Sequence, residues 1–132
     1  MSPKHTKYLF KKYPLLYRGA AKPLTQSLMA FGFECGDGWF HLIDRLSEKL
    51  ERLNAEIPDD PIEAVQVKEK FAGLRFYIGR GTEAAYKLID EAEKESETTC
   101  ETCGKVGTVR GQGWIKCCCD ECWDGENDRP KR

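Results

Sequence analysis

Four cysteines near the C-terminal end place the tightest constraint on what this chain can fold into. They form two C-x2-C pairs, Cys100 with Cys103 and Cys119 with Cys122, and fifteen residues separate the pairs. Two cysteines three positions apart on a tight turn can direct both sulfurs at one cation, and two such turns complete a tetrahedron. Gly104 follows the first pair, where a residue without a Cβ lets the backbone curl round the metal. The spacing predicts a structural zinc ion (Zn2+) held by four thiolates; the alternative is disulfides or unliganded thiols.

The number of cysteines favours metal binding over disulfides. The 132-residue chain has seven cysteines, so a disulfide framework would leave one unpaired. The N-terminal segment lacks the form of a signal peptide, and residues 27–33 are the longest apolar candidate, far short of the roughly 18 residues that span a bilayer. Cysteines in a chain without a secretion signal indicate a reducing compartment. We therefore expect a cytoplasmic protein with no membrane partner.

Charge is distributed unevenly along the chain. Residues 1–22 form a basic arm without acidic residues, whereas the whole chain has a net charge of −1. Tyrosines interleave with these cations, a composition that contacts phosphates and stacks on bases. Nucleic acid is thus a possible partner of the arm, aided by the tail at residues 129–132. The candidate contacts are Lys4, Lys7, Lys11, Lys12, Arg18 and Lys22.

A second interpretation of the same segment is structural. Tyr8, Leu9, Tyr13 and Leu16 fall near helical spacing. The arm could then pack its aromatic rings on the core and leave its lysines in water.

The sequence predicts two helices in its first half. Ser2 and Pro3 are typical of a helix start, and Pro14 would end that short helix. A longer amphipathic helix is predicted further on, with Asp37 as its cap. Its apolar stripe is Trp39, Leu42, Ile43, Leu46, Leu50 and Leu53.

A β-hairpin and another amphipathic helix are predicted next. Alternation of apolar and polar residues over 65–71 and 74–78 predicts two strands that turn at Ala72 and Gly73. Val65, Val67 and Phe71 would form the apolar side of the first strand. Thr82 is expected to cap the following helix. The buried stripe of that helix would be Ala85, Leu88, Ile89 and Ala92.

The cysteine lobe completes the predicted architecture. Residues 106–110 and 112–118 can form two short strands, and only ten polar residues follow Cys122, too few for a further long helix. The prediction is an α+β fold, with two amphipathic helices and a β-hairpin followed by a zinc-ribbon-like knuckle of four cysteines. The expected divisions are residues 1–98 for the α+β domain with its basic arm, 99–124 for the knuckle and 125–132 for a polar tail.

Three consecutive cysteines at 117–119 complicate the choice of ligands. Cys119 keeps the two-residue spacing to Cys122 and is the predicted ligand. Strand alternation puts Cys117 on the same side as Cys119, where it could serve as a spare thiol beside the site. Cys118 would lie on the opposite face and pack as a small hydrophobic residue.

Enzymatic activity is not expected. Four thiolates leave no open position on zinc for an activated water. The chain has two histidines and contains no HExxH, GxxxxGK[ST] or GxGxxG motif. Cys35 precedes the long helix and could act as a nucleophile with His41 as its base, which gives a weaker alternative, a thiol enzyme. We otherwise predict no catalytic residues and no small-molecule substrate.

Three segments together resemble a family of small bacteriophage and prophage proteins. They are FECGDGWF at 33–40, VKEKFAGLRF at 67–76, and the pairs CETCG at 100–104 and CDEC at 119–122. The resemblance implies a phage origin, and hence the cytoplasm of a host cell, and a metal knuckle. It implies no biochemical activity.

These observations lead to one main functional hypothesis and its rivals. We expect a zinc-stabilised, non-enzymatic phage accessory protein that binds a host protein, as a host-takeover or counter-defence factor or an inhibitor. The charged hairpin at residues 68–75 would be accessible to such a partner. The alternative is a nucleic-acid-binding zinc-ribbon module that uses the basic arm.

Overall fold

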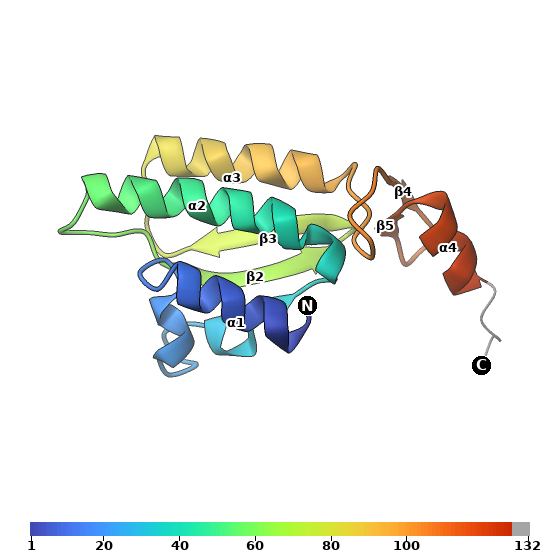
Figure 1. The fold of residues 1–132 in the computed structure, drawn as a ribbon. Coiled ribbons are helices and arrows are strands. Elements are labelled where there is room, and N and C mark those ends of the chain that lie inside the picture. The colour runs from blue at the N-terminus through green and yellow to red at the C-terminus, as the bar shows by residue number, and fades with distance from the viewer. Residues whose placement is uncertain (128–132) are drawn as a thin grey trace.

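The computed structural model describes residues 1–127 and shows a two-layer body with a small lobe at one end (Figure 1). Helices and a mixed sheet build the body, which confirms the expected α+β class. The helices of the body are α1 (Pro3–Lys12), α2 (Phe40–Glu56) and α3 (Glu83–Ser96). Its strands are β1 (Phe33–Glu34), β2 (Ala64–Lys70) and β3 (Gly73–Ile78), in the order β1-β2-β3. The lobe contains β4 (Thr108–Arg110), β5 (Lys116–Cys118) and α4 (Asp120–Asn127).

The N-terminal segment is a folded part of the body. Ser2 caps α1 by accepting a hydrogen bond from the His5 amide, and Pro3 occupies the first turn, as the sequence predicts. Leu9, Tyr13, Leu16 and Tyr17 are buried in the core. The Tyr17 hydroxyl lies 2.6 Å from Ser47 Oγ of α2. The basic segment therefore packs its aromatic rings inward, in agreement with the structural interpretation and not with a free arm.

The long helix α2 forms as expected, although its predicted cap is wrong. Its apolar stripe of Leu42, Ile43, Leu46 and Leu50 is buried. A 3-10 turn over Asp37–Trp39 separates Asp37 from the first turn of α2, so its carboxylate cannot reach those amides. Asp37 instead accepts hydrogen bonds from the Ser2 amide and the His5 ring, and both lower the pKa of its carboxyl group.

The β2–β3 hairpin turns one residue earlier than predicted. Lys70 pairs with Gly73, so the two-residue loop is Phe71–Ala72, with φ values of +52° and +66°. Positive φ at both loop positions matches the twist of a hairpin but is uncommon for residues with a Cβ. The amide of Ala72 donates to Glu69 Oε2 over 2.8 Å, which helps to hold the turn. Phe71 is 71% exposed, so its predicted place on the apolar side of the strand is wrong.

Helix α3 lies along the outer edge of the sheet. Thr82 caps it through the Ala85 amide, as predicted. Strand β3 has β2 on one side only, and its outward amides at Leu74 and Phe76 donate to Ser96 and Glu93 of α3. Ser96 Oγ lies 2.9 Å from the Leu74 nitrogen, and Glu93 Oε2 lies 3.0 Å from that of Phe76. Side chains of α3 therefore close the edge that β3 would otherwise offer to another strand.

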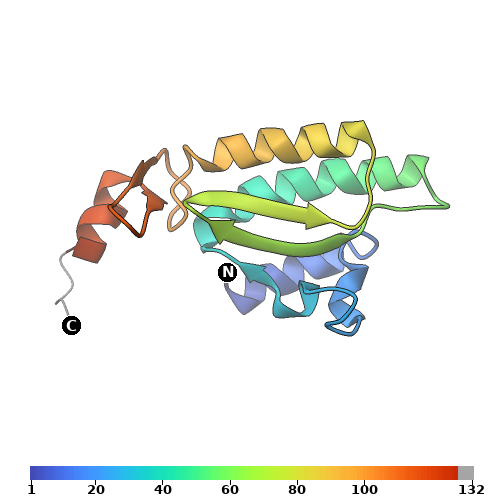
Figure 2. The ribbon, with the colours of Figure 1, turned by 180° about the vertical axis from the view of Figure 1, so that it is seen from behind.

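The sheet is covered on one face. Val67, Leu74 and Phe76 are buried on the side of the helices. Figure 2 shows the opposite face of β2 and β3, with α2 behind the strands and α3 along the edge of β3. In the described part of the chain, no helix covers this face.

The strained turn gives a test of the fold. We expect Phe71→Asn to stabilise the protein by about 0.5 kcal/mol, because asparagine tolerates a left-handed conformation better than phenylalanine does. The midpoint of thermal unfolding should rise by about 2 °C.

Tyr86→Asn is the matched control, since Tyr86 is an exposed aromatic residue within α3. It should lower the midpoint slightly, because asparagine is a weaker helix former. A lower midpoint for Phe71→Asn would contradict the strain argument.

Candidate metal centre

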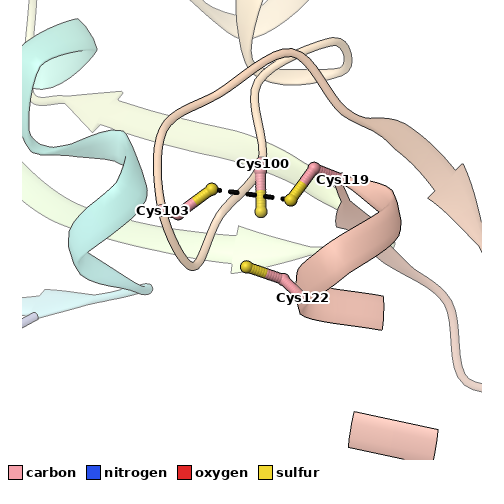
Figure 3. Close-up of side chains that lie close together, drawn as sticks. All are labelled: Cys100, Cys103, Cys119 and Cys122. Carbon is pink, nitrogen blue, oxygen red and sulfur yellow. Dashed lines mark hydrogen bonds between the residues drawn. The ribbon is translucent and has the colours of Figure 1, made fainter. Parts of the chain in front are cut away.

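The first cysteine pair lies on a tight turn that follows α3. The Cys100 amide donates to the Lys105 carbonyl over 2.7 Å, and the Gly104 amide donates to the Cys100 carbonyl over 2.9 Å. Gly104 has a φ of +84°, so the residue after the pair has the conformation for which glycine is best suited. The turn brings the Cys100 and Cys103 side chains to the same side of the chain (Figure 3).

The second pair lies at the start of a helix. Cys119 immediately precedes α4 and Cys122 lies in its first turn, where a helical step of three places both side chains on one face. The sequence predicts no long helix after Cys122, and α4 is a short helix of eight residues that begins at Asp120, before Cys122. Asp120 and Glu121 in the first turn of α4 favour a helix start through the helix dipole.

Part of the segment predicted as a polar tail, residues 125–132, is helical. Residues 125–127 belong to α4. Residues 128–132, with Arg129 and Arg132 of the predicted basic tail, lie outside the described residues.

The four predicted cysteines converge on one point. The sulfurs of Cys100, Cys103, Cys119 and Cys122 all lie within 4.8 Å of one another. Those of Cys103 and Cys119 are 3.6 Å apart, which is too long for a disulfide bond (Figure 3). None of the seven cysteines, all of which lie within the described residues, forms a disulfide bond. The cluster could hold a metal ion.

The electrostatics of the cluster favour a bound cation. Burial acts to raise the pKa of Cys100, but amides of Cys103, Cys119 and Thr102 donate hydrogen bonds to its sulfur and bring the pKa down to about 6. The pKa of Cys122 is raised by burial and by the neighbouring thiols. One thiolate thus forms readily, while further thiolates at this separation need a positive charge between them.

The two remaining cysteines of the run differ from the expectation. Cys117 directs its thiol away from the cluster, to the Glu97 carbonyl at 3.3 Å. Cys118 packs with the buried Cys100 and Cys119. Cys118 is buried as a small residue, as predicted, but it packs against two of the four converging cysteines. Burial raises the pKa of the Cys117 thiol, and Cys100 lies near enough to raise it further.

The lobe docks on the glycine-rich loop that precedes α2. The Gly38 amide donates to the Glu101 carbonyl over 2.8 Å, and the Gly36 amide donates to the Glu101 carboxylate over 2.9 Å. Trp39 Nε1 donates to the Thr99 carbonyl over 2.9 Å. A Cβ at Gly38 would lie 2.2 Å from the Cys100 carbonyl oxygen, so the two backbones meet at a distance that only glycine permits.

This docking was not predicted from the sequence. Two glycines flanking Asp37 directly before a tryptophan were the available signal, but nothing in the sequence ties them to residues more than sixty positions away. No pattern in the sequence predicts that Glu101 is buried or that it accepts these hydrogen bonds. Its burial raises the pKa of its carboxyl group.

Cys35 is a buried residue of the core, 8% exposed. Burial raises the pKa of its thiol to about 12. A nucleophilic cysteine needs a lowered pKa, so this environment works against the thiol chemistry considered above. His41, the suggested base, is exposed on α2.

The six basic residues of the N-terminal segment divide into two groups. Lys12 lies 3.5 Å from Asp44, and Arg18 and Lys22 pair with Glu63 at 3.2 and 2.6 Å. Lys4, Lys7 and Lys11 are exposed at three- and four-residue steps along α1 and, within residues 1–127, make no ion pair. Only this second group remains available as a basic surface.

No protein-family model, curated protein or solved structure matches this chain. In the described residues, no helix combines the length and apolar character needed to cross a membrane.

The contact between Gly38 and Cys100 can be tested by adding a single methyl group. We expect Gly38→Ala to destabilise the protein by about 2 kcal/mol or more, because the new Cβ would overlap a backbone oxygen that cannot move independently. Chemical denaturation would measure the change in the free energy of unfolding.

Gly79→Ala is the control, since its Cβ would meet nothing closer than Val65 Cγ1 at 3.9 Å. It should change stability by no more than about 0.5 kcal/mol. Equal stability of the two variants would show that the docking contact is absent in solution.

Proposed function

We propose that this chain is a zinc-stabilised phage accessory protein that acts by binding a host protein and has no catalytic activity of its own. The convergence of four cysteine sulfurs within 4.8 Å carries the proposal. A Zn–S bond of about 2.3 Å implies a sulfur–sulfur edge of about 3.8 Å in a regular tetrahedron. The 3.6 Å between Cys103 and Cys119 is close to that length.

The donor set favours a structural metal. Four sulfurs fill the coordination sphere of zinc, and thiolates select zinc over the hard cations magnesium and calcium. Bound zinc would supply the positive charge that lets all four thiols ionise. It would also link the turn after α3 to the start of α4, so the hairpin between them would be held in place.

Exposed apolar side chains on this hairpin support a protein partner. Val106, Val109 and Trp114 are 83%, 47% and 69% exposed. The nearby cations Arg110 and Lys105 pair with Asp120 and Glu121. An apolar surface whose charges are neutralised is better suited to a protein surface than to a polyanion. The phage origin is supported by the sequence resemblance.

Lys4, Lys7 and Lys11 favour a second candidate, binding of nucleic acid along α1. Their side chains lie in solvent on one helix. Neutralising phosphates releases counterions, so binding through these lysines should weaken steeply as salt increases.

Metal content is the first test of the proposal. We expect about one zinc per chain by elemental analysis, and Cys119→Ser should lose it because a ligand is removed. Cys118→Ser should retain zinc, since Cys118 is not among the four converging sulfurs. Structural zinc is worth about 10–16 kcal/mol in small finger peptides, so a chelator should unfold at least the region after Thr99. Protein that carries no stoichiometric metal would refute the zinc assignment.

Partner class can be tested by affinity capture from host lysate, with and without nuclease. We expect a stoichiometric host protein that survives nuclease treatment. Trp114→Ala should reduce its recovery, because interfaces depend strongly on exposed aromatic anchors.

Tyr86→Ala provides the control, because it removes an exposed aromatic ring from α3. Recovery that is lost after nuclease treatment, and lost in a Lys7→Glu/Lys11→Glu variant, would instead support the nucleic-acid candidate.

A further inference from the structure

We propose that the uncovered face of the β2–β3 hairpin binds an extended acidic segment of a partner protein that carries one apolar anchor residue. This inference rests on the proposed function as a protein-binding module and names a surface for it. The surface is separate from the exposed side chains of the metal-held lobe.

The register of the hairpin defines the side chains on this face. Lys68 pairs with Arg75 and Gln66 pairs with Tyr77, and paired residues share a face. Lys70 lies two positions beyond Lys68 and therefore points the same way. Figure 2 shows this side of the two strands, with α2 behind them. We call Gln66, Lys68, Lys70, Arg75 and Tyr77 the open face.

Three cations of the open face make no close ion pair, although Arg75 is near enough to Glu93 of α3 to oppose the rise in the pKa of that carboxyl group that burial causes. Among residues 1–127, Lys68, Lys70 and Arg75 make no ion pair, whereas arginines elsewhere pair with acids on neighbouring segments. Arg75 Nη1 donates to the Leu74 carbonyl and lies over Gly73. Glu34 on the adjoining strand pairs in register with Lys68 and so shares this face, where it accepts a hydrogen bond from Gln66 at 3.4 Å. The three cations still outnumber this one carboxylate. In a chain of net charge −1, this face is a local positive surface that complements acidic side chains.

An apolar hollow adjoins one end of the open face. Leu24, Leu28, Val65 and Tyr77 line it, together with polar residues of the loop over 25–27. Leu24 and Tyr77 are exposed, at 53% and 41%. The hollow offers a place for one aliphatic or aromatic side chain of a ligand.

Strand geometry fixes the spacing that a ligand would need. A strand rises about 3.3 Å per residue, so Arg75 lies about 7 Å from Tyr77 and the Lys70–Gly73 pair lies about 13 Å away. A parallel or antiparallel extended segment has the same rise. With its anchor in the hollow, it would place acidic side chains over the cations two and four residues from the anchor.

Recognition must come from side chains and not from strand addition. Glu93 and Ser96 occupy the outward amides of β3, and on the other side β1 and the Leu28 amide pair with β2. Strand β2 is therefore already paired on both sides, the outward amides of β3 at Leu74 and Phe76 are bonded, and β1 is an edge strand of only two residues. We expect a ligand to lie across the face and not to extend the sheet.

The open face is less suited to single-stranded nucleic acid. Tyr77 supplies the one aromatic ring of the open face, whereas successive bases need successive rings on which to stack. Phe71 lies at the turn with Lys70 over its ring at 5.6 Å. The hollow beside it is lined by apolar and uncharged polar residues, so it offers no cation to neutralise a phosphate. An acidic peptide with an apolar anchor matches both the cations of the open face and the apolar hollow beside it.

Selection from a random peptide library on the full-length protein tests this inference. We expect enriched peptides to carry acidic residues two and four positions from an aliphatic or aromatic residue. Affinity of a labelled enriched peptide, measured by fluorescence anisotropy, should fall about tenfold or more in Lys68→Glu/Arg75→Glu. Leu28→Asp should weaken binding of the same peptide, because it places a negative charge in the hollow that receives the apolar anchor.

The control variant is Lys49→Glu/Lys87→Glu, which makes the same charge change at exposed lysines of α2 and α3. It should alter affinity by less than about twofold, because these lysines lie on the helices and not on the open face. Zinc content and thermal midpoint should be the same in both double variants.

Several outcomes would overturn the inference. They are selection of no peptides above background, selection of neutral or basic peptides, and equal binding by Lys68→Glu/Arg75→Glu and its control. Displacement of the peptide by a lower concentration of oligothymidylate would assign the face to nucleic acid. Failure of the proposed function can be told apart from failure of this inference. Protein without zinc, or without a nuclease-resistant host partner, would contradict the proposed function, but its binding of peptide to the open face could still be measured.

Discussion

The close backbone contact between Gly38 and the first cysteine turn joins the two parts of this protein. The Gly38 amide bonds to the Glu101 carbonyl, and the Trp39 ring bonds to the Thr99 carbonyl. The loop that starts α2 and the turn that starts the metal lobe therefore position each other. Because α2 supplies much of the buried core, a change in the lobe can be transmitted to the body through this contact.

The lobe has little else to stabilise it. Its buried cluster consists of three cysteines, with Cys122 and Trp123 packed against them. So small an apolar cluster cannot offset the conformational entropy of ordering some twenty-five residues. A metal bound by four thiolates would contribute about as much free energy as a whole domain usually has, about 5–15 kcal/mol. Metal binding at the four cysteines, together with docking on Gly38, would account for the fold of the lobe.

Much of the fold could be predicted from local sequence patterns, whereas the contacts between distant segments could not. The capping roles of Ser2 and Thr82 depend on residues three positions away, and both caps are present. The cysteine spacing covers about twenty residues, and the four sulfurs come together as predicted. Helix α4 was missed because its polar sequence lacks an apolar stripe. The role assigned to Asp37 was wrong because its partners lie thirty-two and thirty-five residues earlier in the chain. No local pattern could reveal that contact or the docking on Gly38.

The closed edge of the sheet bears on how the protein avoids aggregation while it folds. A hairpin forms early because its contacts are local, and its free edge can pair with the same edge of another molecule. Helix α3 begins five residues after β3 ends, so the segment that supplies Ser96 and Glu93 is synthesised directly after the strand it protects. The interval during which a newly made hairpin is exposed to other chains is consequently short. The order of elements along the chain thus serves solubility as well as structure.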